Sequence, residues 1–398
     1  MPFAAAISTH PVTAQATGEV VGEVLERLGR YPDLVVLFVT AAHAGALEDA
    51  AKTVRHVLEP SLLIGCAAES VVGGALEIEQ EPAVSLWAGV TGPVAPLKMW
   101  TEQMSIGAAG EDPDGESLRI AGWPEPLPFE PQAVLLLGDP FTFPVEGFLK
   151  GLEDAHPGLP VLGGMASAAH GPGGNRLVLN DQVLSAGAIG ALIGPGTEIS
   201  TVVSQGCRPI GRPLVVTRAE RNVIYELAGE PALDRLLEMA RDGMSERDIR
   251  LINQGLHVGL VIDEHKASFG RGDFLIRNVI GADRSNGAIA VGDEVEVGTT
   301  MQFHVRDAEA ADEDLRQLLV DRHADGALIF TCNGRGSRLF SQPNHDAGVV
   351  EDLLHDPPLA GFFAAGEVGP VGGRNFLHGF TASLALFRES NPGGKEDL

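Results

Sequence analysis

A strand, a helix, a second strand and a glycine-rich loop follow one another three times along the chain. The strands are short apolar runs, and the helices carry apolar residues at helical spacing. The copies occupy Leu34–Gly74, Ala133–Gly174 and Ala327–Gly373. Three long copies are too few for a solenoid, so we expect units that assemble into mixed sheets with helices outside. The alternative is that ordinary α/β patterns recur here by chance.

The composition agrees with an α/β fold. The segment Leu34–Thr40 is apolar throughout, which is typical of a strand covered on both faces. Aromatic residues make up only 5% of the chain, so we expect cores built from Val, Leu, Ile and Ala. The predicted fold class is therefore α/β, with two domains of mixed β-sheets flanked by helices and built from repeated β-α-β-loop-β units.

We expect the larger domain boundary near Arg212–Thr217, ahead of an amphipathic helix at Pro231–Arg241. Residues 1–214 would form a first α/β domain, and residues 215–398 a second. The second domain would contain the third copy of the repeat and three additional strands. These strands are predicted at Gly259–Ile262, Asp273–Ile280 and Met301–Val305.

The charge balance restricts the partners of this chain. With 28 Lys and Arg against 54 Asp and Glu, the formal net charge is −26, which repels phosphate backbones and anionic lipid. We therefore expect neither nucleic acid nor a membrane as partner. No apolar run approaches the length of a membrane span, and the amino terminus lacks a basic region. Three scattered cysteines indicate no disulfide framework and no metal site, so a cytoplasmic protein is expected.

The loop Cys332–Gly336 follows an apolar strand, and ligands of open α/β sheets bind beyond the carboxyl ends of strands. Arg335 offers a planar fork for a carboxylate, Asn333 can donate and accept, and the backbone at Gly336 allows close approach. Cys332 adds a thiol. We expect these residues to bind an amino acid or small carboxylate; the alternative is a turn in which Arg335 pairs with an acidic residue.

A second loop of the same repeat is expected at the same end of the sheet. It contains Glu367 and Gly369, and Asn375 follows. Glu367 could accept from a ligand ammonium while Arg335 holds its carboxylate. The competing interpretation is an ion pair of Glu367 with Arg335 or Arg374 that only fixes two loops.

Arg277 interrupts an otherwise apolar strand, and a buried guanidinium requires a partner or a water-filled cavity. We include it among the candidate ligand-binding residues, with a solvent-facing position as the alternative. No loop matches the phosphate-binding pattern GxxxxGK[ST], so the sequence indicates no nucleotide and no other cofactor.

Several segments resemble the FIST family of sensory domains, with a FIST_N part followed by a FIST_C part. The resemblance covers nearly the whole chain and is carried, in order, by Gln205–Gly211, Ile224–Leu233, Phe274–Gly281, Gly298–Ala308, Cys332–Gly336 and Gly366–Pro370. It implies an intracellular sensor of small ligands, with amino acids or similar metabolites as ligands and a signalling protein as partner. No kinase, cyclase or F-box segment is visible.

We therefore expect a non-enzymatic, cytoplasmic ligand sensor. One alternative is an enzyme with Cys332 as nucleophile and His345, His355 or His378 as base, because a thiolate needs a neighbouring histidine or positive charge. The other alternative is a protein-interaction scaffold. The sequence leaves the ligand, the partner and the oligomeric state open.

Overall fold

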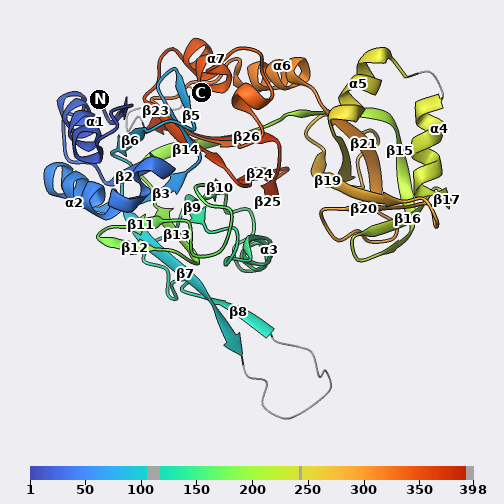
Figure 1. The fold of residues 1–398 in the computed structure, drawn as a ribbon. Coiled ribbons are helices and arrows are strands. Elements are labelled where there is room, and N and C mark those ends of the chain that lie inside the picture. Colours follow the sequence, from blue (N-terminus) through green and yellow to red (C-terminus); the bar gives the residue numbers. More distant parts are fainter. Residues whose placement is uncertain (105–116, 242–243, 391–398) are drawn as a thin grey trace, which may run out of the picture. The chain divides into compact units, whose positions relative to one another are not determined.

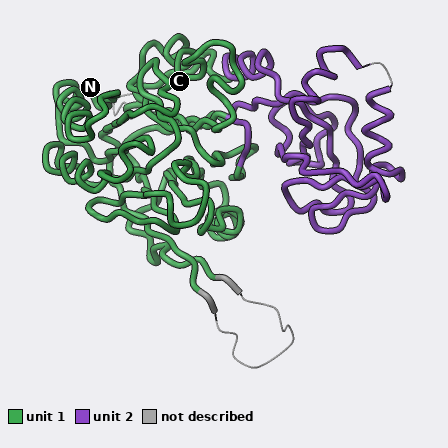
Figure 2. The backbone as a smooth tube through the Cα atoms, in the orientation of Figure 1, with its two compact units in different colours: residues 1–203, 318–377, 382–398 green, residues 204–317, 378–381 purple. Residues whose placement is uncertain are grey.

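The computed structural model describes residues 1–104, 117–241 and 244–390, and the chain divides into two compact units (Figure 2). Unit 1 comprises residues 1–203, residues 318–377 and the segment that begins at 382. Unit 2 comprises residues 204–317 and 378–381. The compact units therefore differ from the expected division at residue 214. The third copy of the repeat belongs to unit 1, with the other two copies.

The three predicted copies are present in unit 1, and each contains two parallel strands joined by a helix (Figure 1). The first has β2 (Leu34–Thr40), the 3-10 turn η1 (Ala41–Ala46), α2 (Leu47–Leu58) and β3 (Leu62–Ala68). The second has β9 (Ala133–Gly138), α3 (Val145–Ala155) and β10 (Val161–Met165). The third has β22 (Gly326–Cys332), the turn η2 (Gly336–Arg338), α7 (His345–Leu354) and β23 (Leu359–Ala364). The sequence pattern thus predicted these elements correctly.

Two further strands extend each parallel pair in the same order. They are β6 (Val84–Gly89) and β1 (Phe3–Ser8) in the first sheet, β13 (Ala188–Ile193) and β7 (Val94–Met104) in the second, and β26 (Thr381–Glu389) and β14 (Thr197–Gln205) in the third. The strand β8 (Ser117–Ala121) lies beside β7. Because the three sheets repeat one strand order, unit 1 has an internal threefold pattern.

The repeats exchange hairpins. The hairpin of β4 (Ser70–Gly73) and β5 (Leu76–Glu79) follows β3 but pairs with β23. The hairpin of β11 (Leu177–Leu179) and β12 (Gln182–Leu184) follows β10 but pairs with β3. The hairpin of β24 (Glu367–Val371) and β25 (Arg374–His378) follows β23 but pairs with β10. Each repeat therefore completes the sheet of another.

One glycine inside the second strand of each repeat is explained by the same steric requirement. A Cβ atom on Gly65, Gly163 or Gly361 would overlap the carbonyl oxygen of the paired residue on the neighbouring parallel strand. The paired residues are Leu37, Leu136 and Ile329. These glycines are needed because the two backbones approach too closely for a side chain.

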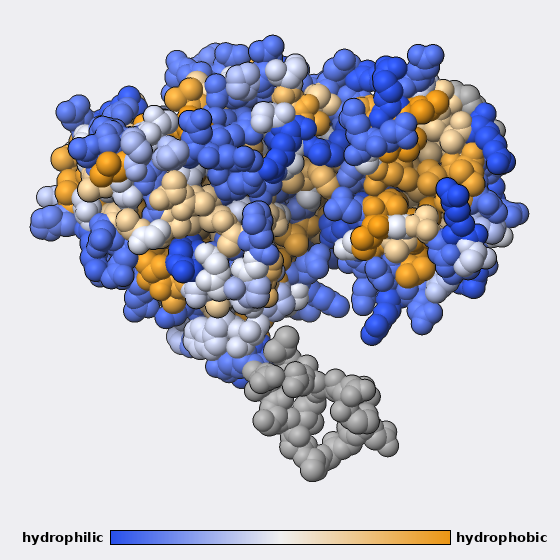
Figure 3. Space-filling view, viewed as in Figure 1, coloured by the Kyte–Doolittle hydropathy of each residue, from blue (hydrophilic) through white to orange (hydrophobic). Residues whose placement is uncertain are grey.

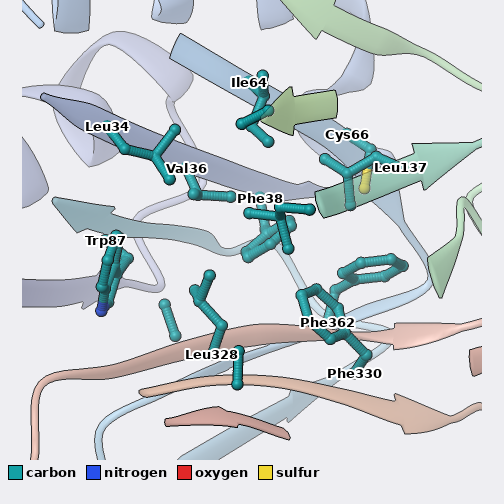
Figure 4. Packing of buried hydrophobic residues seen from close by; sticks show 14 of the residues in the cluster. Leu34, Val36, Phe38, Ile64, Cys66, Trp87, Leu137, Leu328, Phe330 and Phe362 are labelled. Carbon is teal, nitrogen blue, oxygen red and sulfur yellow. The ribbon is translucent and has the colours of Figure 1, made fainter. Parts of the chain in front are cut away.

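The main core of unit 1 draws residues from all three sheets (Figure 4). Phe38, Phe330 and Phe362 meet there, with ring centroids 5.0 Å apart for Phe38 and Phe362 and 5.7 Å apart for Phe330 and Phe362. The expectation of purely aliphatic cores was therefore incomplete, since the few aromatic side chains concentrate at this centre. Helices α1 (Thr13–Arg27) and α2 cover the outer face of the first sheet, and α3 packs in the core of the second sheet.

Unit 2 enters the chain between β14 and β22 and contains a separate sheet. Its strand order is β15 (Cys207–Glu220), β21 (Thr300–Arg306), β18 (Leu256–Val261), β19 (Phe274–Asp283), β20 (Ala288–Val291), β16 (Val223–Leu227) and β17 (Glu230–Pro231). An additional pairing of β15 with β16 closes this sheet on itself. The helices of this region are α4 (Ala232–Arg241), α5 (Glu246–Gln254) and α6 (Ala308–Leu319).

Candidate functional site

The structure brings the two predicted ligand loops of unit 1 next to each other. Cys332 pairs in register with Ala364, and the Asn333 backbone N–H donates to the Ala364 carbonyl oxygen at 3.0 Å. Glu367 begins β24, the next strand along the chain, which pairs with β10 of another sheet, and it is fully buried. The loop that contains Asn333 therefore contacts the end of β23, from which the chain continues to Glu367.

The guanidinium of Arg335, however, already pairs with a carboxylate of the protein. Its Nε donates to Asp346 Oδ2 and its Nη2 to Asp346 Oδ1, both at 2.7 Å, and both side chains are buried. Burial by itself would raise the pKa of Asp346, but the charge and hydrogen bonds of Arg335 hold that pKa well below its ordinary value. Asp346 thus occupies the guanidinium edge that we expected a ligand carboxylate to take.

The exchanged hairpin of the first repeat and the residue before it supply three further acids to this loop and to the first turn of α7. Glu69 pairs with Arg338, Glu79 accepts hydrogen bonds from the backbone N–H and hydroxyl of Ser337 at 2.8 and 2.6 Å, and Glu77 accepts from the Ala347 backbone N–H at 2.9 Å. Burial and the neighbouring Asp346 raise the pKa of Glu77 to about 7. These contacts tie the hairpin β4–β5 to the loop before α7, which is a structural role.

The other predicted site residues also have structural surroundings. A Cβ on Gly336 would crowd Glu79 and Phe363, and one on Gly369 would crowd Ser383 and Val203. The Asn375 side chain accepts from the Val161 backbone N–H and donates to the Leu159 carbonyl oxygen, both at 2.8 Å. Asn375 therefore braces a loop.

Arg277 belongs to unit 2, whereas the other predicted site residues belong to unit 1. Its Nε lies 2.7 Å from Asp293 Oδ2. The carboxylate of Asp293 is thus a partner for the guanidinium that interrupts β19.

Unit 2 contains a cavity of about 860 Å³ between β15, β21 and the helices α4 and α5. Apolar side chains from the sheet and from α4 and its following segment form part of its lining: Ile210, Leu214, Met239, Met244 and Phe303. Three arginines also line it, namely Arg208, Arg212 and Arg235. Charged side chains thus line this cavity together with apolar ones.

A bulge in β15 forms one edge of this cavity. The pairing of β15 with β21 breaks between Ile210 and Leu214, and Gly211 has a positive φ of 66°. The Gln302 side-chain amide fixes the bulge by donating to the Gly211 carbonyl oxygen at 2.9 Å. Pro213 fits here because it has no N–H to contribute to the interrupted ladder. The bulge thereby exposes Arg212 at the cavity.

Two of the three lining arginines are committed to carboxylates. Arg208 pairs with Asp248 at 2.6 Å and with Asp307 at 2.9 Å. The hydrogen bond from Arg208 lowers the pKa of Asp248, so that this carboxylate stays ionised.

Arg235 pairs with Glu238 at 2.8 Å and also donates to the Leu227 carbonyl oxygen at 3.2 Å. Arg212 has no ion pair or side-chain hydrogen bond within residues 1–104, 117–241 and 244–390. Of the three arginines at the cavity, Arg212 is therefore the one without a carboxylate partner among the described residues.

The helices beside the cavity pack loosely on the sheet. Only Ala232 is buried in α4, and no residue of α5 is buried. Leu237 of α4 and Ile249 of α5 are 43% and 45% exposed, and Figure 3 shows hydrophobic residues at the surface of unit 2 on the face drawn. A ligand in the cavity would therefore contact helices whose apolar side chains are still partly exposed and can be buried further.

Sequence reasoning noted parts of this site without recognising it. Gln205–Gly211 was identified only as a family segment, and the helix Pro231–Arg241 only as an amphipathic helix. The usable signal was Gly211-Arg212-Pro213, a bulge pattern within an extended segment. The closeness of this bulge to Met239 and Phe303 depends on tertiary pairing, which the local sequence does not reveal.

The fold and the cavity define a class: a two-unit α/β protein with three hairpin-exchanging repeats and an inserted closed sheet that carries a cavity of small-molecule size. The chain belongs to the FIST family. The FIST N domain model matches residues 33–230, and the FIST C domain model matches residues 232–370. FIST domains are associated with sensory signal transduction. The cavity draws Arg208 to Leu214 from the first match and Arg235 to Phe303 from the second.

Similar proteins occur in mycobacteria. The chain is 44% identical over 398 residues to the uncharacterized protein Rv0628c of Mycobacterium tuberculosis, covering 97% of this chain and 100% of that protein. It is 43% identical over 395 residues to the uncharacterized protein Mb0898c of Mycobacterium bovis, covering 97% and 99%. In the part of the chain that the structure describes, none of the helices has the length and apolar character needed to cross a membrane.

Proposed function

We propose that this protein senses a small organic molecule and that the cavity of unit 2 receives it. The observation that carries the proposal is the cavity itself, whose volume of about 860 Å³ lies in the range of small-molecule sites and whose lining combines apolar side chains with arginines. The proposed ligand site thus lies in unit 2, and not at Arg335 and Glu367 of unit 1 as the sequence led us to expect. The family's association with sensory signal transduction supports the same conclusion.

Binding can become a signal if the ligand favours one arrangement of α4 and α5 over another. These helices have apolar residues at half-buried and exposed positions beside the cavity, so an apolar ligand would increase their buried area. A ligand shifts a conformational equilibrium only by its difference in affinity for the two states. The α4–α5 surface is accordingly the part of unit 2 that we expect a signalling partner to recognise.

A thermal-shift screen tests this function directly, because a ligand that binds only the folded state raises the melting temperature. The panel contains organic acids, amino acids, amines, alcohols and nucleosides. We compare the natural chain with Met239→Trp, which fills the cavity, and with Leu237→Trp, which alters an exposed position of the same helix.

We expect at least one class to stabilise the natural chain and the Leu237→Trp variant but not the Met239→Trp variant. The proposed function is wrong if no compound stabilises the natural chain, or if every active compound stabilises the Met239→Trp variant equally.

A further inference from the structure

The charges at the cavity of unit 2 specify what it binds. We infer that the ligand is an organic anion with an apolar body, that its carboxylate pairs with Arg212, and that its apolar part lies against Leu214, Met239 and Phe303. This inference rests on the proposed function, because it names the class of ligand for the same cavity.

The lining of the cavity carries more positive than negative charge. Three arginines and two acids, Glu238 and Asp248, line the cavity, which leaves one positive charge in excess. This excess occurs in a chain whose formal net charge is −26. A local positive excess in so acidic a chain favours a negatively charged ligand, since short-range pairing outweighs the screened repulsion of distant carboxylates.

The backbone at Arg212 makes this side chain available to a ligand. The bulge at Gly211 takes this residue out of the β15–β21 ladder, and the hydrogen bond from Gln302 to the Gly211 carbonyl oxygen holds the bulge in place. Bulges of this kind redirect a side chain near functional sites. A guanidinium without a carboxylate partner among the described residues can offer its planar fork to the carboxylate of a ligand.

The two acids of the lining distinguish a simple anion from an amino acid. Asp248 accepts from Arg208 at 2.6 Å and Glu238 accepts from Arg235 at 2.8 Å. An α-ammonium group would have to share a carboxylate that already neutralises an arginine. The cavity therefore disfavours the zwitterion that the sequence led us to expect and favours a carboxylate without an ammonium group.

The apolar part of the lining suits an aliphatic ligand body. Met239 and Met244 are unbranched and adapt to irregular shapes, while Phe303 and Leu214 belong to the strands of the sheet. An aliphatic body of several carbons would bury area against these side chains, at roughly 25 cal/mol for each Å² removed from water. Affinity should accordingly rise with the length of the aliphatic chain.

Four six-carbon probes separate these contributions by isothermal titration calorimetry: hexanoate, norleucine, hexanol and hexylamine. The protein variants are Arg212→Gln and, as the matched control, Arg218→Gln. Arg218 lies on the same strand, is exposed and pairs with Glu226 outside the cavity. We expect hexanoate to bind best and to lose about tenfold in affinity in Arg212→Gln but less than about twofold in Arg218→Gln, which corresponds to one charge-assisted hydrogen-bonded pair.

Octanoate should bind more tightly than hexanoate, and butanoate more weakly. The inference is overturned if hexanol equals hexanoate, if norleucine or hexylamine binds more tightly than hexanoate, if Arg212→Gln leaves hexanoate affinity unchanged, or if no carboxylate in the series binds. Each of these results leaves the proposed function standing as long as some compound of the thermal-shift panel distinguishes Met239→Trp from Leu237→Trp.

Discussion

Arg335 and Asp346 form a two-point ion pair from which solvent is excluded: Arg335 is 0% exposed, Asp346 is 1% exposed, and the two hydrogen bonds are both 2.7 Å long. Thr331 also donates to Asp346, at 2.7 Å. The pair joins the loop after β22 to the first turn of α7. Its position explains why an arginine in a glycine-rich loop need not be a ligand-binding residue.

Replacing Arg335 with Met should destabilise unit 1 strongly. Removal of one partner leaves Asp346 buried without its counter-charge, which typically costs about 3–5 kcal/mol. Urea unfolding followed by hydrogen exchange of β22 and β23 measures the loss. The matched control is Arg338→Met, because Arg338 is 46% exposed and pairs with Glu69 near the surface, where such pairs contribute about 1 kcal/mol or less.

If Arg335 instead held a ligand carboxylate, as its residue type suggested, the variant would fold normally and would only lose its ligand. A stable Arg335→Met protein that fails to bind a ligand would restore Arg335 as a binding residue. Equal losses of stability for Arg335→Met and Arg338→Met would show that burial of the pair is unimportant.

Glu77 should make unit 1 less stable as the pH rises. Burial, with Asp346 nearby, raises the pKa of Glu77 from 4.5 to about 7 in the folded chain. Folding thus favours the protonated carboxyl of Glu77. The resulting stabilisation of unit 1 is fully present below pH 4.5 and is lost as the pH rises through 7. At about 1.4 kcal/mol per pKa unit, the contribution is at most about 3 kcal/mol.

The variant Glu77→Gln tests this effect, because Gln keeps an acceptor oxygen for the Ala347 backbone N–H but cannot ionise. Between pH 5 and pH 8, the unfolding free energy of the natural chain should fall relative to that of the variant. A difference that is constant over this range would show that Glu77 has an ordinary pKa.

Two buried histidines should make unit 2 sensitive to acid. His257 and His304 are cross-strand partners of β18 and β21, and their rings contact Phe380 and Phe274 at centroid distances of 4.5 and 4.8 Å. Burial lowers both pKa values from 6.5 to about 4, with added repulsion from Arg306 at His257 and from His257 at His304. Stability that is present above pH 6.5 is therefore lost as the pH falls to 4.

Hydrogen exchange of β18 and β21, corrected for intrinsic rates, should show protection falling between pH 6.5 and pH 4. The double variant His257→Gln with His304→Gln should remove most of this dependence, whereas His265→Gln, at an exposed position, should retain it. Acid sensitivity that persists in the double variant would assign it to other groups.

The sequence was informative about local elements and much less so about their partners. Leu34–Thr40 and Leu47–Leu58 were predicted with the observed bounds, because continuous apolar runs and helical spacing reflect local burial. The pairing of β4 with β23 could not be predicted, since nothing in Ser70–Gly73 records which repeat supplies the neighbouring strand. The position of unit 2 before the third repeat likewise depends on long-range contacts that the local sequence does not record.

The site was harder to predict than the fold. Arg335 has the residue type that a carboxylate site needs, but its role depends on Asp346, which α7 brings back to the loop. Arg212 was noted only as part of a domain boundary, and its importance follows from a bulge and two helices that are separate in sequence. Residue type suggests a chemistry, whereas tertiary contacts decide whether a group is occupied or available.

Alkylation should distinguish Cys332 from the other two cysteines. Cys332 is half-buried and its thiol interacts electrostatically with Arg335, while Cys66 and Cys207 are fully buried. Burial also raises the pKa of the Cys66 thiol strongly, which disfavours the reactive thiolate. Iodoacetamide should therefore label one site per folded chain, and Cys332→Ser should abolish that labelling. Labelling of all three cysteines at equal rates without denaturant would contradict the burial pattern.

The glycines inside the second parallel strands of the three repeats should tolerate no side chain. A methyl group on Gly65, Gly163 or Gly361 would overlap a backbone carbonyl oxygen of the adjacent strand, and a paired strand can relieve this overlap only by giving up hydrogen bonds. Each substitution by Ala should therefore lower the melting temperature by several degrees, since each 1 kcal/mol costs a chain of this size about 2–4 °C.

Glycines of α1 are the matched controls for this test. A Cβ on Gly18 or Gly22 meets no atom within 4 Å, so Ala should be accepted there and should stabilise the helix by up to about 1 kcal/mol. Gly65→Ala and Gly361→Ala should cause losses of similar size, whereas Gly163→Ala should cause a larger one, because Gly163 also has a φ of 143° that other residues rarely adopt. A loss confined to one of the three would show that the repeats share a strand order without sharing the steric requirement at this position.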